Sequence, residues 1–162
     1  MQIALISDTH DHVEHVQYVA DYLRNQDIHV VLHAGDVTVP HILEILDSLD
    51  VWIARGNMDH YDELSATATK LFGEDRFASS HDIDLEGHRI ALVHGHDRAL
   101  LHGLAYSKSY DYVVRGHTHA PQDRRIKNTR VLNPGAVGNT GWRRSTFAIL
   151  DLATGELQTI FI

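Results

Sequence analysis

Five apolar segments of the sequence are followed by side chains that can bind metal ions or transfer protons. The side chains that follow these segments are Asp8, His10, Asp36, Asn57, Asp59, His94, His96, His117 and His119. Carboxylate, amide and imidazole groups are ligands for divalent transition metals. The functional crevice of an open α/β sheet lies beyond the carboxyl ends of its strands, so strands ending at one edge would bring these groups together. The pattern therefore predicts a metal site with only nitrogen and oxygen ligands.

Each part of this pattern also has a structural interpretation when it is taken alone. An aspartate after a strand is most often a turn residue or a helix cap. The His-Gly-His sequence at 94–96 could equally form a polar loop, whereas the two histidines after Gly116 have little structural purpose. Gly35 and Gly56 directly precede candidate ligands, and glycine permits the close backbone approach that a crowded ion site needs. The joint occurrence of these features at five strand ends is what indicates a metal site.

Alternating apolar and amphipathic segments predict the elements that position these side chains. Apolar runs predict strands at 2–6, 29–33, 51–54 and 111–114. Helical spacing predicts helices at 12–25, 40–49, 63–71 and 97–105. Three hairpins are expected, of which the first covers 77–94 and turns at 86–87, and the others turn at 128 and at 154–155. Strand–helix alternation followed by a strand-rich half predicts an α/β fold with two sheets and helices outside them.

Length, composition and charge limit the classes of function. The chain has 162 residues, which predicts a single domain over 1–162. It has no cysteine, which excludes disulfides, thiolate metal sites and cysteine nucleophiles. A net charge of −8 disfavours bulk binding to nucleic acid or anionic membranes, although one pocket could still bind a phosphate. No apolar run approaches the ~20 residues of a membrane helix, so we expect no membrane span and a cytoplasmic protein, with a homo-oligomer left open.

The candidate ligands occur in an order that is similar to a known family. The motifs are Asp8-x-His10, Gly35-Asp36, Gly56-Asn57, His94 and Gly116-His117-x-His119, followed by the turn Asn133-Pro134-Gly135. This set resembles the calcineurin-like metallophosphoesterases, and the short chain resembles their small YfcE-type phosphodiesterases, which are related to a eukaryotic retromer subunit. The resemblance covers nearly the whole chain. It implies a four-layer α/β/β/α sandwich, with two mixed sheets flanked by helices.

The resemblance also implies a binuclear metal centre. One divalent ion would be held by Asp8, His10, Asp36 and His119. The other would be held by Asp36, Asn57, His94 and His117, with Asp36 bridging. By the resemblance we favour Mn²⁺, while Zn²⁺, Fe²⁺, Ni²⁺ and Co²⁺ also suit these ligands. Two divalent cations outweigh the charge of the two aspartates, so the site would attract phosphate even on an acidic protein.

The implied activity is hydrolysis of a small phosphate ester, most simply a phosphodiester, by in-line attack of a hydroxide that bridges the two metals. A phosphomonoesterase is the nearest alternative. A non-catalytic binding scaffold like the retromer subunit is a second alternative, and the presence of all seven ligands argues against it.

The residue that protonates the leaving group is open. Met58 stands where many relatives have a histidine proposed for that role, and methionine cannot donate a proton. The candidates are His96, Asp59 or a water molecule, although Asp59 could instead orient a ligand. Arg143 and Arg144 form a small basic pair for which solvated charge is the default and phosphate contact the alternative.

Overall fold

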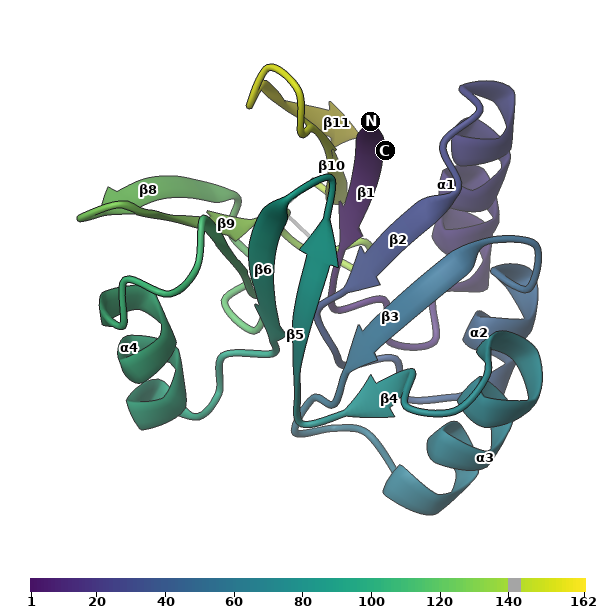
Figure 1. The fold of residues 1–162 in the computed structure, drawn as a ribbon. Helices are drawn as coiled ribbons and strands as arrows, with labels where there is room; N and C mark the ends of the chain where they lie inside the picture. The colour runs from purple at the N-terminus through teal and green to yellow at the C-terminus, as the bar shows by residue number, and fades with distance from the viewer. Residues whose placement is uncertain (140–143) are drawn as a thin grey trace.

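The computed structural model describes residues 1–139 and 144–162, and two β-sheets form its centre (Figure 1). Within these residues the first sheet has six strands in the order β11 (Leu157–Phe161), β10 (Thr146–Asp151), β1 (Gln2–Ile6), β2 (Val30–His33), β3 (Asp50–Ala54) and β4 (Phe77–Ala78). The second has five, in the order β5 (Ser80–Leu85), β6 (His88–Val93), β7 (Tyr112–Val114), β9 (Thr129–Asn133) and β8 (Gln122–Ile126). Both sheets are mixed: the first has parallel strands β1–β4 with antiparallel strands at one edge, and the second has parallel strands at its centre with an antiparallel strand at each edge.

Helices cover the outer face of each sheet. The first sheet is covered by α1 (Val13–Asn25), α2 (Pro40–Ile45) and α3 (Tyr61–Phe72), and the second by α4 (Arg98–Tyr106) (Figure 1). Separate apolar clusters lie under α1–α3, between the two sheets, and under α4. These three cores separate four layers, so the predicted α/β/β/α sandwich is confirmed. No helix in the described part of the chain is long and apolar enough to cross a bilayer.

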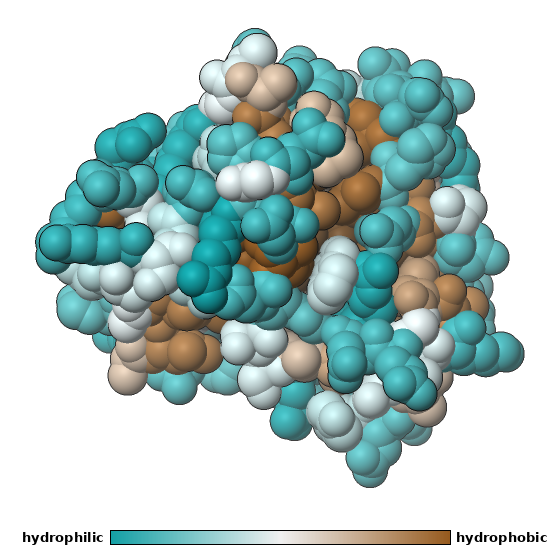
Figure 2. All heavy atoms as spheres, viewed as in Figure 1, coloured by the Kyte–Doolittle hydropathy of each residue, from teal (hydrophilic) through white to brown (hydrophobic). Residues whose placement is uncertain are grey.

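The first strand shows how the sequence alternation builds two of these cores at once. Successive side chains of a strand point to opposite faces. Ala4 and Ile6 therefore pack under the helices, whereas Ile3 and Leu5 pack between the sheets. All four side chains are fully buried, which is why this strand is an apolar run rather than an alternating one. Figure 2 shows hydrophobic residues in the middle of the viewed face, over the strands where the sheets meet.

Two elements differ from the sequence prediction. The helix that begins at Pro40 ends at Ile45 instead of reaching residue 49, because tighter bonds such as Leu46 N–H to the Leu43 carbonyl replace the helical ones. Phe77–Ala78, predicted as part of the hairpin at 77–94, instead pairs with β3 in the first sheet. The predicted turn itself is confirmed, since Glu86 and Gly87 both have positive φ, as a two-residue hairpin loop requires.

Candidate metal centre

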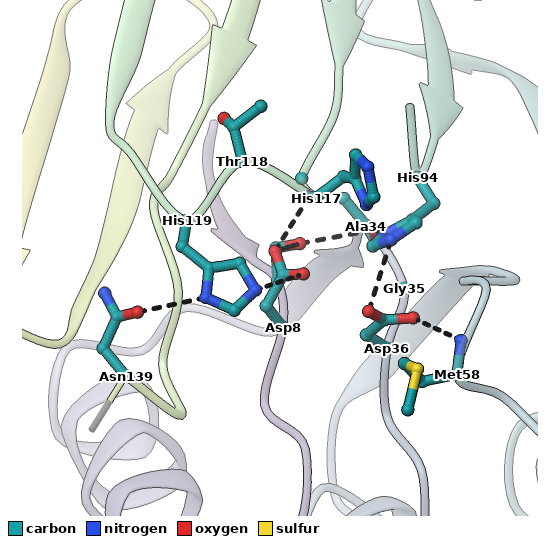
Figure 3. Close-up of polar contacts among 12 residues, drawn as sticks. Asp8, Ala34, Gly35, Asp36, Met58, His94, His117, Thr118, His119 and Asn139 are labelled. Carbon is teal, nitrogen blue, oxygen red and sulfur yellow. Dashed lines mark hydrogen bonds and ion pairs between the residues drawn. The ribbon is translucent and has the colours of Figure 1, made fainter. Parts of the chain in front are cut away.

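The loops after β1, β2, β6 and β7 meet where the carboxyl ends of these strands converge. The backbone N–H of His117 donates to Oδ2 of Asp8 over 3.0 Å, which joins a loop of the second sheet to a loop of the first (Figure 3). The His94 ring makes a second link, because its Nδ1 lies 2.7 Å from the Ala34 carbonyl oxygen. The two sheets are therefore held together directly beneath the predicted ligands.

One group of potential ligands consists of Asp8, His10 and His119. One ligand atom from each of these residues lies within 4.8 Å of the others. Nε2 of His119 lies 3.2 Å from Oδ1 of Asp8, and the His10 and His119 ring centroids are 5.4 Å apart. These three residues belong to the first metal site that the family resemblance implies.

A second group consists of Asp8, Asp36 and His94, all buried. Nε2 of His94 lies 3.4 Å from Oδ2 of Asp36 and 3.1 Å from Oδ1 of Asn57. The His117 ring lies next to that of His94, with centroids 5.1 Å apart. All seven predicted ligands are thus neighbours. Asp8 is the residue common to the two groups, whereas the resemblance gives the bridging position to Asp36.

The residues fit a cation at this place. Asp8 Oδ1 is buried and, within the described residues, has no assigned hydrogen bond, and Nε2 of His119, a predicted ligand atom, lies 3.2 Å from it. Asp8 and Asp36 are both buried, so two carboxylates share an environment in which unpaired charge is costly. Neutral imidazoles and an amide oxygen offer further ligand atoms around them. A divalent cation would satisfy the free carboxylate oxygen and balance the two negative charges.

Neighbouring groups shift the pKa values of these side chains. Burial by itself would raise the pKa of Asp36, but hydrogen bonds from His94 and from the Met58 N–H outweigh it and lower that pKa. Burial opposes charge on His94, yet its bonds to Asp36 and to the Ala34 carbonyl raise its pKa. The Asp8 carboxylate raises the pKa of His119. Protons therefore compete for the positions that a metal would take, since imidazole must be neutral to bind a metal.

Five of the seven predicted ligands have a left-handed backbone. Their φ angles are 50° for Asp8, 48° for His10, 58° for Asp36, 70° for His117 and 56° for His119. Residues other than glycine adopt positive φ in only a few per cent of cases, at a cost of roughly 1–3 kcal/mol each. Such strain concentrates at functional sites, where the surrounding structure enforces it. The backbone here is shaped to turn these side chains towards one another.

Hydrogen bonds on the far side of two histidine rings fix which nitrogen faces the centre. A carbonyl oxygen can only accept, so Nδ1 of His94 donates to Ala34 and its Nε2 is the nitrogen that could bind a metal. Nδ1 of His119 lies 3.2 Å from Oδ1 of Asn139, which leaves its Nε2 towards Asp8 (Figure 3). This arrangement is typical of metal-binding histidines.

Asp59 holds the loop that carries Asp36. Its buried carboxylate accepts hydrogen bonds from the backbone N–H groups of Asp36, Val37, Thr38 and Gly56, at 2.7–3.1 Å. A carboxylate bonded in this way acts as an acceptor only. Of the two roles considered for Asp59, these bonds favour positioning a ligand over donating a proton.

Asn133 performs a similar task for the loop of His117 and His119. Its Nδ2 donates to the Gly116 carbonyl and to Thr118 Oγ1, both over 3.0 Å. Its Oδ1 accepts the Gly135 N–H over 2.8 Å, which closes the turn noted in the sequence. The Asn133-Pro134-Gly135 turn therefore fixes the loop between the last two histidine ligands.

Sequence reasoning did not include His33 among the candidate residues of the site. The ring is fully buried, and its Nδ1 accepts the Gly35 N–H while its Nε2 lies 3.0 Å from Thr9 Oγ1. It thereby ties the loop of the first ligands to the loop of Asp36. Its position at the end of an apolar strand, three residues before Asp36, was the available signal.

We expect His33 to make the metal-free protein less stable in acid. Burial lowers the pKa of His33 from 6.5 to about 4. Between pH 4 and pH 6.5, His33 therefore binds a proton more tightly in the unfolded chain than in the folded one. The contribution of His33 to the free energy of unfolding is complete above pH 6.5 and is lost as the pH falls towards 4, and the loss is about 3 kcal/mol at most. Urea unfolding in chelator across this range should show a shallower pH dependence for His33→Gln. The exposed His29→Gln is the control, and equal slopes for wild type and His33→Gln would contradict the prediction.

His96 and Met58 lie at the rim of the centre. His96 is exposed, its ring lies 5.4 Å from that of His94, and it lines a 300 Å³ cavity together with Asn57. Met58 is 56% exposed and lines a different cavity with His10.

Of the basic pair, Arg143 lies outside the described residues, while the Arg144 guanidinium lies 4.5 Å from the Phe161 ring centroid.

Gly56→Ala is expected to reduce metal binding by at least tenfold. A Cβ at this position would collide with the carboxylate and the backbone nitrogen of Asp36, so the ligand would have to move. Displacement of supporting groups typically lowers metal affinity by roughly 10–100-fold. Titration of Mn²⁺ into metal-free protein measures the effect. Gly103→Ala in α4 is the matched control, because a Cβ there meets nothing within 4 Å, and equal affinities for the two variants would refute the argument.

Comparisons with known proteins show the family to which this chain belongs. The family model of the calcineurin-like phosphoesterase superfamily domain matches residues 1–155. A probable metallophosphoesterase of Methanothermobacter thermautotrophicus is 34% identical over 145 residues, which are 84% of this chain and 77% of the relative. A phosphodiesterase of Methanocaldococcus jannaschii is 25% identical over 165 residues, covering 100% of this chain and 99% of the relative.

Solved structures give the same result at the level of the fold. The structure of an archaeal phosphodiesterase matches with a TM-score of 0.91 at 25% identity, and the match covers 100% of both chains. The family model and the 34% identical relative each cover most of the chain, and the motifs of the resemblance lie within the matched range. The chain belongs to the calcineurin-like phosphoesterase superfamily.

Proposed function

We propose that this protein is a binuclear metal-dependent phosphodiesterase, formed by one metallophosphoesterase domain over residues 1–162. The proposed ligands are Asp8, His10, Asp36, Asn57, His94, His117 and His119. The observation that carries the proposal is the convergence of two buried carboxylates with histidine nitrogens, in which the buried Asp8 Oδ1 has no assigned hydrogen bond among the described residues and lies 3.2 Å from Nε2 of His119. Mn²⁺ is the favoured ion by family resemblance. The phosphodiesterases among the similar proteins support the diester as substrate.

The ligand set defines the electrostatics of the reaction. Divalent cations held here would polarise a phosphate group and lower the pKa of water. The two aspartates contribute two negative charges, while neutral histidines and Asn57 contribute none. A loaded centre is therefore net positive and attracts an anionic ester to a protein whose overall charge is −8.

The remaining residues orient the ligands and handle the proton of the leaving group. Asp59 and Asn133 hold the ligand-bearing loops through backbone hydrogen bonds. We assign to His96 the role of proton donor to the leaving alcohol, because it is exposed at the rim and shares a cavity with Asn57. Met58 takes no part in proton transfer.

Hydrolysis of two aryl esters tests the proposal. Bis(p-nitrophenyl) phosphate and p-nitrophenyl phosphate should be compared in Mn²⁺ and in chelator, with metal content measured by elemental analysis. We expect about two equivalents of metal and faster cleavage of the diester, abolished by chelator. Faster cleavage of the monoester would favour a phosphomonoesterase. Bound metal without cleavage of either ester would favour the non-catalytic scaffold, against which the presence of every ligand argues.

A further inference from the structure

A cavity of 480 Å³ lies between α4 and the hairpin of β8 and β9. Gly95, His117 and Thr118 line it, so it shares a wall with the candidate metal centre. His117 is a proposed ligand, and Gly95 directly follows another. A phosphate ester held at the centre can therefore extend one of its organic groups into this cavity, which we call the α4 pocket.

Part of the lining of the α4 pocket is apolar and aromatic. Leu101, Ala105 and Val131 line it, and they also belong to the apolar cluster beneath α4. The Tyr106 ring stacks on that of His102 with centroids 4.2 Å apart, and both rings line the pocket. Figure 2 shows hydrophobic residues at the surface over α4, with hydrophilic ones around them. This part of the lining suits a flat or apolar organic group.

Cationic side chains also line the α4 pocket. Arg98, Arg115 and Arg124 line it, and its described lining residues include no aspartate or glutamate. Arg115 already donates to the Gly116 carbonyl and to Gln122 Oε1. The guanidinium groups of Arg98 and Arg124 have no hydrogen bond or ion pair with any part of the chain that the structure describes. Two uncommitted guanidinium groups thus face one pocket on a protein whose net charge is −8.

We propose that the α4 pocket selects phosphodiesters in which one alcohol carries a second anionic group. The apolar and aromatic residues of the lining would bind the body of that alcohol, and Arg98 and Arg124 would bind its anion, since guanidinium pairs with phosphate or carboxylate through two parallel hydrogen bonds. This inference rests on the proposed phosphodiesterase activity. It adds a substrate class to that activity, which the metal centre alone does not select.

Two substrates with the same leaving group test the proposal. They are the 5′-(p-nitrophenyl) esters of thymidine 5′-phosphate and of thymidine 3′,5′-bisphosphate. In both, oxygen from water forms a bond to the 5′ phosphorus, the proton that this water loses passes to solvent, and the bond to nitrophenolate breaks with its electron pair, which leaves the nucleotide. At low salt we expect kcat/KM to be about tenfold higher for the bisphosphate ester, the effect of one charge-assisted hydrogen bond. Cleavage of both esters at the same rate would overturn the proposal and leave the proposed activity intact.

Variants assign this preference to the pocket. The double variant Arg98→Gln/Arg124→Gln should lower the preference to twofold or less. Arg125→Gln is the matched control, because Arg125 is the next residue of β8, its side chain points to the opposite face, and it lines a different cavity. A preference that survives in the double variant, or that disappears in the control, would contradict the assignment.

Binding gives a readout that does not depend on turnover. Calorimetry should show thymidine 3′,5′-bisphosphate binding to the metal-loaded protein about tenfold more tightly than thymidine 5′-monophosphate, with the difference lost in the double variant. If neither ester is hydrolysed, the proposed function is wrong, but the comparison of the two nucleotide affinities still tests the second-anion site in the α4 pocket. Equal affinity for the two nucleotides would refute the second-anion site.

Discussion

Asp36→Ala should lower phosphodiester hydrolysis on the order of a thousandfold or more. Changes in groups that merely support metal ligands already cost roughly 10–100-fold, and Asp36 is itself a proposed ligand, shared by both metals in the family resemblance. Its Oδ2 lies 3.4 Å from Nε2 of His94, and its Oδ1 accepts the Met58 N–H. Removing the carboxylate takes one of two negative charges from the centre and releases the loop that contains Asn57 and Met58.

The effect of Asp36→Ala is measured by turnover of bis(p-nitrophenyl) phosphate at saturating Mn²⁺, together with metal content. Asp36→Asn keeps the shape of the side chain but loses the charge, so it should also lose most activity while remaining folded. Asp21→Ala, at an exposed ion pair on α1, is the control that should leave activity unchanged. Activity close to that of wild type in either Asp36 variant would remove the basis for a metal centre at this position.

Asp59→Ala should lower the free energy of unfolding by about 3 kcal/mol or more, since buried N–H groups left without an acceptor cost roughly 1–3 kcal/mol each. Four backbone N–H groups converge on this carboxylate, which is 5% exposed. The loop that they fix carries Asp36, so Mn²⁺ affinity should also fall by roughly 10–100-fold. Urea unfolding in chelator and metal titration measure the two effects.

Asp59→Asn separates positioning from proton donation. The amide oxygen of the new asparagine can still accept some of the four backbone hydrogen bonds. Asp59→Asn should therefore lose less stability and less metal affinity than Asp59→Ala. If Asp59 instead donated a proton, Asp59→Asn would cleave esters with poor leaving groups more slowly, while its metal affinity and stability would be normal. That second result would return Asp59 to the role that we assign to His96.

Local chemistry explains why so much of the fold was predictable. A buried strand must be apolar, so segments such as 2–6 and 51–54 are visible in the sequence. A two-residue hairpin needs positive φ, so Glu86 and Gly87 mark a turn. The ligand types were visible for a similar reason, because polar side chains directly after apolar strands lie at the carboxyl edge of a sheet. The sequence by itself determined the layers, the turns and the identity of the candidate ligands.

Contacts between distant segments decided the rest. Nothing local assigns Phe77–Ala78 to the first sheet, because that depends on the open edge of β3. The bonds of Asp59 reach residues 36–38, and His33 bonds to Thr9, so neither role has a signature in the adjacent sequence. The α4 pocket likewise forms only when α4 packs beside β8 and β9. A side chain's partners are set by how the sheets and loops pack in space, and that packing depends on the whole chain at once.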